Sequence, residues 1–144
     1  PDYSSAASDV YKRQLRFRVG AGVEAIPSST PIRTALRTAR EASQGRRSGA
    51  LLLTDDRGVL EGIMTDGDLR RLLLDNPEAI DGPAAESMTK SPRTLQEDQP
   101  LREAERLVRT HRVDEIPIVD AEGRPVGLLD VQDLITLKIV RDPS

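Results

Sequence analysis

The sequence repeats itself once, and this repeat limits the folds that the chain can adopt. The stretch Gly62–Leu69, GIMTDGDL, recurs 65 positions later as Gly127–Leu134, GLLDVQDL. Upstream of each stretch, the runs Leu51–Leu53 and Ile116–Ile118 match at the same offset. Self-similarity at a fixed period indicates that one structural unit occurs in tandem. Turn residues and apolar spacing predict an α+β fold in which each unit reads strand, helix, strand, strand, helix.

In the first copy, an apolar strand runs into a helix through a short polar turn. Thr65 supplies a hydroxyl where the helix would begin, and Asp66 and Asp68 lie in its first turn, where the helix dipole favours negative charge. A helix N-terminus with free N–H groups also suits a phosphate. The stretch is therefore a well-capped helix start, a ligand site, or both.

The other elements follow from apolar spacing and from prolines. A strand is predicted near Val23–Ile26, and a helix with Thr30 as its N-cap and Pro31 as its first residue. Pro117 fits a strand start or an edge strand better than a central strand. An apolar helix is predicted to end the chain. Each copy is too short to bury a core separately, so the two are expected to share one.

The first fourteen residues are not expected to belong to the fold. Ser4–Gln14, SSAASDVYKRQ, looks like the translation of a transposase-type sequencing adaptor, whose codons encode these eleven residues in order. We therefore predict that residues 1–14 form a disordered, non-native tail, as tags do. Native sequence would begin near Leu15, with the gene upstream lost. The two repeats are then predicted at 15–79 and 80–144.

Composition narrows the class of protein. The formal net charge of −3 does not favour non-specific nucleic-acid binding. The absence of cysteine excludes disulfides and thiolate metal sites, and Asp66–Asp68 is too short a D-x-D pattern to indicate a metal site by itself. The sequence contains no signal peptide and no run of about 18 apolar residues, so a cytoplasmic protein is expected. No residue set resembles a catalytic constellation; His111 is the only histidine.

Both copies carry motifs that resemble the CBS domain family. The motif G-h-h-T-x-x-D ends the first copy and recurs in altered form in the second, and a D-x-x-G hairpin precedes it in each, at Asp55–Gly58 and Asp120–Gly123. The run Gly62–Leu73, GIMTDGDLRRLL, resembles the CBS pair at the C-terminus of KpsF/GutQ-type sugar-phosphate isomerases, such as arabinose 5-phosphate isomerase. The resemblance implies tandem CBS repeats packed as a pseudo-two-fold pair, with clefts between the repeats and further association into homodimers.

The resemblance also implies an adenosyl ligand such as AMP, ADP or ATP. Asp68 would accept hydrogen bonds from the two ribose hydroxyls, and Thr65 would donate to a phosphate at the helix N-terminus. The backbone around Ile26 and Ser28 would meet the base. Asp66 is also a candidate ligand-binding residue of this turn, although it adds a second negative charge near the phosphate, which opposes nucleotide binding.

The second copy departs from this pattern. Asp133 keeps the ribose position, but Asp130 stands where the family has Thr or Ser. A carboxylate repels a phosphate, so the second nucleotide site is expected to be weak or empty. Asp130 can still cap the helix that follows it.

Three functions remain open. The first is a regulatory pair that binds an adenine nucleotide or a pathway nucleotide, as the C-terminal fragment of an arabinose 5-phosphate isomerase. The catalytic domain would then precede Leu15, so the fragment itself would not be catalytic and would require no cofactor. The second is a structural module that stabilises an oligomer and binds nothing. The third is the CBS pair of a different enzyme or transporter.

Overall fold

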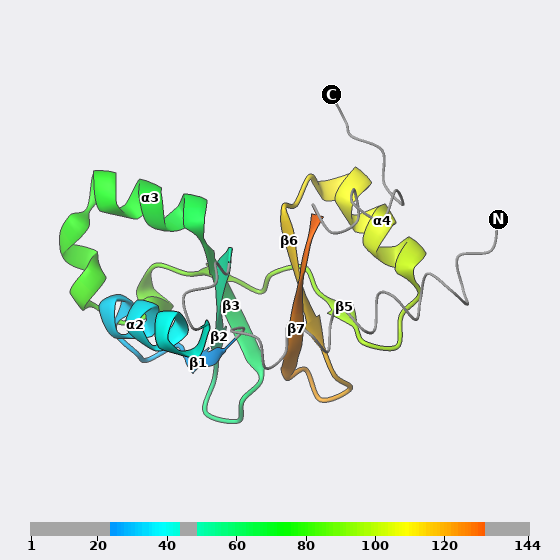
Figure 1. Ribbon diagram of the computed structural model, residues 1–144, viewed down its shortest axis with the longest axis horizontal. Coiled ribbons are helices and arrows are strands. Elements are labelled where there is room, and N and C mark those ends of the chain that lie inside the picture. The colour runs from blue at the N-terminus through cyan, green and yellow to red at the C-terminus, as the bar shows by residue number, and fades with distance from the viewer. Residues whose placement is uncertain (1–23, 44–48, 132–144) are drawn as a thin grey trace.

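The computed structural model of the protein describes residues 24–43 and 49–131 (Figure 1). It contains a four-stranded sheet in the order β1-β2-β3-β4 and a three-stranded sheet in the order β5-β6-β7. The first copy comprises β1 (Ala25–Pro27), α2 (Ile32–Ser43), β2 (Ala50–Thr54), β3 (Leu60–Thr65) and α3 (Asp66–Asp75). Next come η1 (Pro77–Asp81), η2 (Ala84–Glu86), β4 (Thr89–Lys90), β5 (Leu95–Gln96), α4 (Leu101–His111), β6 (Glu115–Val119) and β7 (Pro125–Asp130).

The two copies have the same strand pairing, which confirms that the repeat is structural. In each, the first strand runs parallel to the second, and the second runs antiparallel to the third. Leu52 pairs with Ile63, and Pro117, 65 positions after Leu52, pairs with Leu128. The first copy has the predicted order of strand, helix, strand, strand, helix. The final helix predicted for the second copy lies outside the described residues.

Each sheet buries both of its faces. In Figure 1 the two sheets lie between α2 and α3 on one side and α4 on the other. Because side chains alternate along a strand, Leu51 and Leu53 of β2 face the helices of the first copy, while Leu52 faces the other sheet. The inner faces meet in a cluster of Ala50, Leu52, Ile63 and Leu128. The expected shared core is therefore present, beside one helix-facing cluster in each copy.

Both hairpins are closed by the aspartate of the D-x-x-G pattern. Asp55 Oδ1 accepts hydrogen bonds from the backbone N–H groups of Arg57 at 2.8 Å and Val59 at 3.0 Å. Asp120 plays the same part in the second copy. Gly58 and Gly123 have φ values of 81° and 82°, a backbone conformation that other residues rarely adopt. This requirement explains why glycine occurs at both positions.

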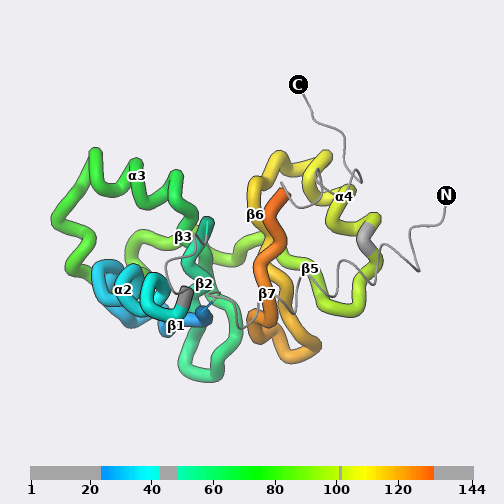
Figure 2. The backbone as a smooth tube through the Cα atoms, viewed as in Figure 1, coloured from blue at the N-terminus to red at the C-terminus, as the bar shows by residue number. Residues whose placement is uncertain are grey.

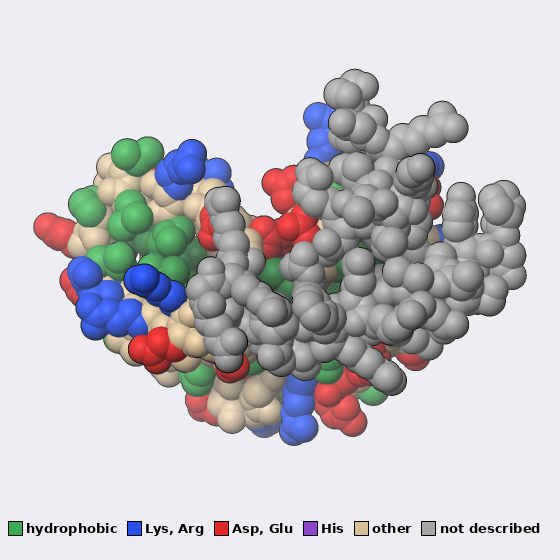
Figure 3. Space-filling view, viewed as in Figure 1, with side chains coloured by type: hydrophobic (Ala, Val, Ile, Leu, Met, Phe, Trp, Pro, Cys, Tyr) green, Lys and Arg blue, Asp and Glu red, His purple; other side chains and the backbone are tan. Residues whose placement is uncertain are grey.

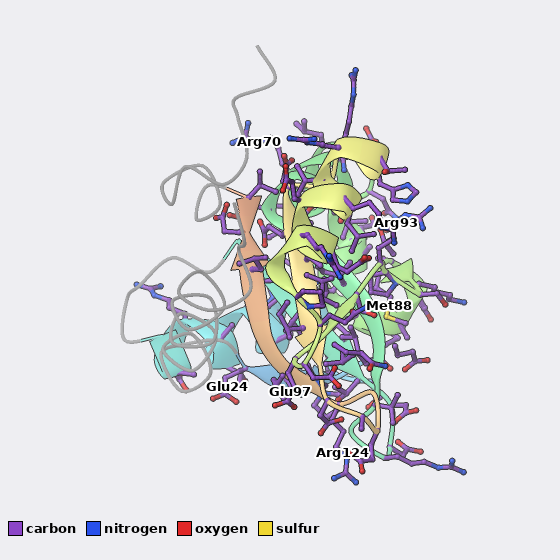
Figure 4. The ribbon with its side chains drawn as sticks, turned by 90° about the vertical axis from the view of Figure 1, so that its right-hand side faces the viewer. Glu24, Arg70, Met88, Arg93, Glu97 and Arg124 are labelled. Carbon is purple, nitrogen blue, oxygen red and sulfur yellow. The ribbon has the colours of Figure 1, made fainter. Side chains whose placement is uncertain are left out.

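The segment 84–90 packs on the sheet of the first copy, although it follows the boundary predicted at 79. Strand β4 pairs with β3, with Ile63 opposite Thr89, and Ala84 and Met88 belong to the core cluster of the first copy. A side chain at Gly62 would collide with the side chain of Met88, the residue labelled in Figure 4. After β4 the backbone crosses to the second sheet (Figure 2). The boundaries 15–79 and 80–144 stay a prediction.

The predicted start of α2 is wrong by one residue. The helix begins at Ile32, and the Pro31 carbonyl accepts the first helical hydrogen bond, from the Ala35 N–H at 2.9 Å. Pro31 rather than Thr30 therefore occupies the N-cap position. The Thr30 backbone is used elsewhere, because its carbonyl accepts from the Ala84 N–H at 2.9 Å. The start of this helix is thus joined to the η2 segment by a backbone hydrogen bond.

Pro117 lies in the central strand of its sheet, not in an edge strand as its type suggests. The Val119 carbonyl accepts from the Glu97 N–H at 3.0 Å, so that side of β6 faces β5. The Pro117 nitrogen, two residues earlier, points to the same side. Pairing with β5 starts only at Leu95, opposite Ile118, so Pro117 precedes the ladder and removes no hydrogen bond from it.

Within the described ranges, no helix has the length and apolar character needed to cross a membrane.

Candidate functional site

The predicted motif forms a capping box at the start of α3. Thr65 ends β3 in an extended conformation, and its Oγ1 accepts a hydrogen bond from the Asp68 N–H at 3.1 Å. In return, Asp68 Oδ2 accepts from the Thr65 N–H at 3.0 Å. The Asp66 N–H donates to the Gly49 carbonyl at 3.0 Å. Two of the first three N–H groups of the helix therefore already have acceptors, and the capping interpretation is confirmed.

Arg71 is part of this turn, and the sequence analysis missed it. Its Nη2 lies 2.5 Å from Asp68 Oδ1, so both oxygens of the Asp68 carboxylate have partners. The Arg71 side chain is 69% exposed and that of Asp68 26% exposed. A ribose that binds Asp68 must share this carboxylate or displace one of its partners. The available signal was the i,i+3 spacing of an acid and a base on one helix.

Gly67 lies near both the Thr65 hydroxyl and the Arg71 guanidinium. A Cβ atom placed on Gly67 would lie 3.6 Å from Arg71 Nη1 and 3.8 Å from Thr65 Oγ1. Hydroxyl and guanidinium groups are both hydrogen-bond donors suited to phosphate oxygens. The carboxylates of Asp66 and Asp68 lie in the same turn and act against an anion. The donor set fits a phosphate if Arg71 offsets part of this negative charge.

Ile26 and Ser28 do not lie beside this turn. Thr65 pairs with Ala50 at one end of β2, whereas the Ser28 N–H donates to the carbonyl of Thr54 at the other end, at 2.8 Å. The length of β2 separates these ends by about 14 Å along the strand. The structure therefore brings Thr65, Asp66 and Asp68 together and leaves Ser28 apart.

Ile26 and Ser28 also have structural roles of their own. Ile26 is 3% exposed and packs in the core of the first copy. Ser28 is 8% exposed, and its Oγ donates to Glu61 Oε2 at 2.6 Å. The Ser28 carbonyl accepts from the Ala85 N–H at 2.8 Å. These contacts tie β1 to β3 and to the η2 segment, and they account for both residues without a ligand.

The second copy repeats the backbone of this turn with a different side chain. The Val131 N–H donates to the Asp114 carbonyl at 2.9 Å, as the Asp66 N–H does to Gly49 in the first copy. Asp130 occupies the position of Thr65 and pairs with Glu115 in the sheet. Asp133 lies outside the described residues, so the weak second site stays a prediction.

The first site is close to residues of the second copy. The carboxylate of Glu115, at the start of β6, occupies the space where a side chain on Gly49 would lie. Figure 3 shows acidic side chains in the hollow between the two halves of the molecule. Among residues 24–43 and 49–131, no group of three or more His, Asp or Glu side chains is arranged to hold a metal ion. The start of α3 is thus a turn near the meeting point of two repeats.

Comparison with known proteins identifies both repeats. The family profile of the CBS domain matches residues 21–75 and 84–139. The arabinose 5-phosphate isomerase KpsF of Escherichia coli is 36% identical over 85 residues, which cover 59% of this chain and 26% of that protein. The isomerase GutQ of Salmonella typhi is 33% identical over 92 residues, or 64% of this chain and 28% of that protein. Inosine-5'-monophosphate dehydrogenase of Aquifex aeolicus is 36% identical over 92 residues, which cover 63% of this chain and 18% of that protein. The chain spans about a quarter of the length of these isomerases.

Solved structures of low sequence identity share the fold. The cytosolic domain of the Mg²⁺ channel MgtE, in complex with ATP, gives a TM-score of 0.67 at 24% identity, covering 81% of this chain and 45% of that one. CBSX2 of Arabidopsis thaliana, in complex with AMP, gives a TM-score of 0.61 at 24% identity, covering 84% of this chain and 98% of that one. The CBS domain pair of protein MJ0100, in complex with 5'-methylthioadenosine and S-adenosyl-L-methionine, gives a TM-score of 0.68 at 22% identity, covering 86% of this chain and 94% of that one.

Proposed function

This chain belongs to the CBS domain family, and from that premise we propose that it is a regulatory domain pair that binds an adenosyl ligand at the start of helix α3. The observation that carries the proposal is the turn Thr65–Asp68, which holds a hydroxyl and a carboxylate within one helical turn, close to the second repeat. Proteins of the same fold have been solved with ATP, AMP and S-adenosyl-L-methionine.

The chemistry of the turn suits a nucleoside with a phosphate. Asp68 offers two acceptor oxygens to the ribose hydroxyls, and such charge-assisted hydrogen bonds contribute about 1.5–3 kcal/mol each. The Thr65 hydroxyl can donate to a phosphate near the positive end of the α3 dipole. Both groups now form the capping box, so a ligand would compete with the cap. The register of β1 gives little support to a base contact near Ile26 and Ser28.

A thermal-shift screen of the whole chain tests the proposal. The ligands are AMP, ADP, ATP, S-adenosylmethionine and CMP-Kdo, a sugar nucleotide included as the candidate pathway ligand. We expect a saturable shift with at least one ligand. Asp68→Ala should weaken its binding by about ten- to a hundredfold, whereas Asp56→Ala, an exposed acid in the hairpin of the same copy, should not. No shift with any ligand, or equal effects of both variants, would argue against the site.

A second candidate function is oligomerisation without a ligand. Two exposed leucines of α3 support oligomerisation. Leu73 is 41% exposed and Leu74 is 78% exposed, and no residue of this helix is buried. An exposed apolar patch can mark a protein–protein contact, and these two leucines would contribute to one. The expected partner is a second copy of the chain. Light scattering should then give a dimer that Leu74→Ser weakens. A monomer at all concentrations would exclude this function.

We further propose that the pair regulates an arabinose 5-phosphate isomerase in a longer, cytoplasmic protein. The similarity to KpsF and GutQ supports this parent, while the match to inosine-5'-monophosphate dehydrogenase keeps a different enzyme as the alternative. The chain should not convert arabinose 5-phosphate to ribulose 5-phosphate, and turnover by the purified chain would refute this division of roles.

A further inference from the structure

We propose that Arg71 is a specificity residue of this site, which selects adenosyl ligands that carry a phosphate over those that do not. The inference rests on the proposed function, since it concerns the ligand of the same turn. It comes from the position of a side chain that neither the motif nor the sequence analysis assigned.

The guanidinium of Arg71 is held over the first turn of α3. Its Nη2 binds Asp68 Oδ1 at 2.5 Å, and its Nη1 lies 3.6 Å from the point where a Gly67 side chain would begin. Thr65 Oγ1 lies 3.8 Å from the same point. The hydroxyl and the guanidinium therefore lie near the same point, which no side chain of residue 67 occupies.

An anion beside Gly67 would be near two donors, the Thr65 hydroxyl and the Arg71 guanidinium. A guanidinium carries five N–H donors, and the contact with Asp68 leaves several of them for a phosphate. The positive charge also offsets the carboxylates of Asp66 and Asp68, which otherwise repel a phosphate. Because the Arg71 side chain is 69% exposed, it can turn toward a ligand at little cost in packing. A nucleoside without phosphate can contact Asp68 but gains nothing from Arg71.

The competing explanation is that Arg71 only pairs with Asp68 on the helix surface. Exposed pairs at this spacing contribute little to stability, and such a pair has no reason to discriminate between ligands. The two explanations agree on the effect of removing Arg71 on folding, and they differ in its effect on ligand preference.

Calorimetric titration of adenosine and of AMP into the whole chain distinguishes these explanations. Arg71→Gln should weaken AMP binding by about tenfold or more and should not weaken adenosine binding, because loss of the guanidinium frees Asp68 Oδ1 for the ribose. Arg70→Gln is the matched control, since Arg70 is the adjacent arginine of the same helix (Figure 4), and it should change neither affinity. Equal effects of Arg71→Gln on both ligands, or no effect on AMP, would overturn the proposal.

Gly67→Ala gives a second test that does not depend on charge. Its new methyl group would make ordinary contacts of 3.6–4.0 Å, and alanine favours a helix over glycine, so the melting temperature should not fall. The methyl group would occupy this point, so AMP binding should weaken while adenosine binding does not. If the wild-type chain binds adenosine as tightly as AMP, the proposed role of Arg71 is refuted, but the proposed function is not. Wild-type chain that binds neither refutes the proposed function as well.

Discussion

Replacing Thr65 separates the capping role of the turn from its proposed ligand role. Thr65→Ala deletes the oxygen that accepts from the Asp68 N–H at 3.1 Å, while Thr65→Ser keeps it. The reciprocal bond, from the Thr65 N–H to Asp68 Oδ2 at 3.0 Å, uses the backbone of residue 65 and can remain in both variants. Thr65→Ala therefore removes one of the two hydrogen bonds of the capping box and leaves the other in place.

The expected loss follows from the geometry of the cap. Losing a Thr N-cap costs about 1 kcal/mol, within a range of about 0.5–2 kcal/mol. For a domain of this size, 1 kcal/mol lowers the melting temperature by about 3–5 °C. Thr65→Ser should stay within about 0.5 kcal/mol of wild type, since serine caps at least as well as threonine.

Urea unfolding of the three proteins without ligand measures these differences. We expect Thr65→Ala to lower the urea midpoint with an unchanged slope, because the surface exposed on unfolding is the same. A Thr65→Ala protein as stable as wild type would show that α3 does not depend on this cap. A Thr65→Ser protein as unstable as Thr65→Ala would assign the effect to the lost methyl group instead.

Two other predictions concern the shared core and the single histidine. Leu52→Ala should lower the free energy of unfolding by about 2–5 kcal/mol. Because Leu52 and Leu128 both belong to the cluster between the sheets, a double-mutant cycle of Leu52→Ala and Leu128→Ala should give a coupling energy of about 0.5–3 kcal/mol. Additive losses would contradict a shared core. Loss of hydration, followed by the nearby charges of Arg93 and Arg106, lowers the pKa of His111 below 6.5. The unfolded chain then binds the proton more readily, so stability should fall as pH drops from about 7.5 to about 5.5. The fall should be smaller in His111→Gln, and an equal fall in both proteins would show that other groups cause it.

The sequence predicted those elements whose signals are local or repeated. Apolar runs, the D-x-x-G hairpins and the Thr65–Asp68 cap each depend on residues a few positions apart, and the apolar runs and the hairpins recur in the second copy. The side-chain cap of α3 was predicted correctly because its two partners, Thr65 and Asp68, are only three residues apart.

The errors fall where distant segments meet. The predicted cap at Thr30 was wrong by one residue, and the Thr30 carbonyl instead accepts from the N–H of Ala84, which is far away in sequence. Pro117 looked unsuited to a central strand, and only the register of β5 shows why it fits. Ser28 was assigned to the base by its position in the family pattern; strand register places it at the end of β2 opposite to Thr65, and its role in binding stays a prediction.

Arg71 was missed for a different reason. Its spacing from Asp68 is visible in the sequence, but many surface pairs share that spacing and have no further role. Only its place near Gly67 and the Thr65 hydroxyl gives this arginine a position of interest. The position of the Arg71 side chain is thus known only from the structure, because the motif does not include this residue.

Isothermal titration of AMP into the whole chain and into Asp68→Ala tests the central claim most directly. The account predicts saturable binding with a stoichiometry near one per chain, because Asp130 replaces the hydroxyl residue in the second copy. It also predicts that Asp68→Ala weakens binding by about ten- to a hundredfold while the chain stays folded. Heats equal to dilution, or unchanged affinity in Asp68→Ala, would contradict the claim and leave the turn at the start of α3 as a helix cap alone.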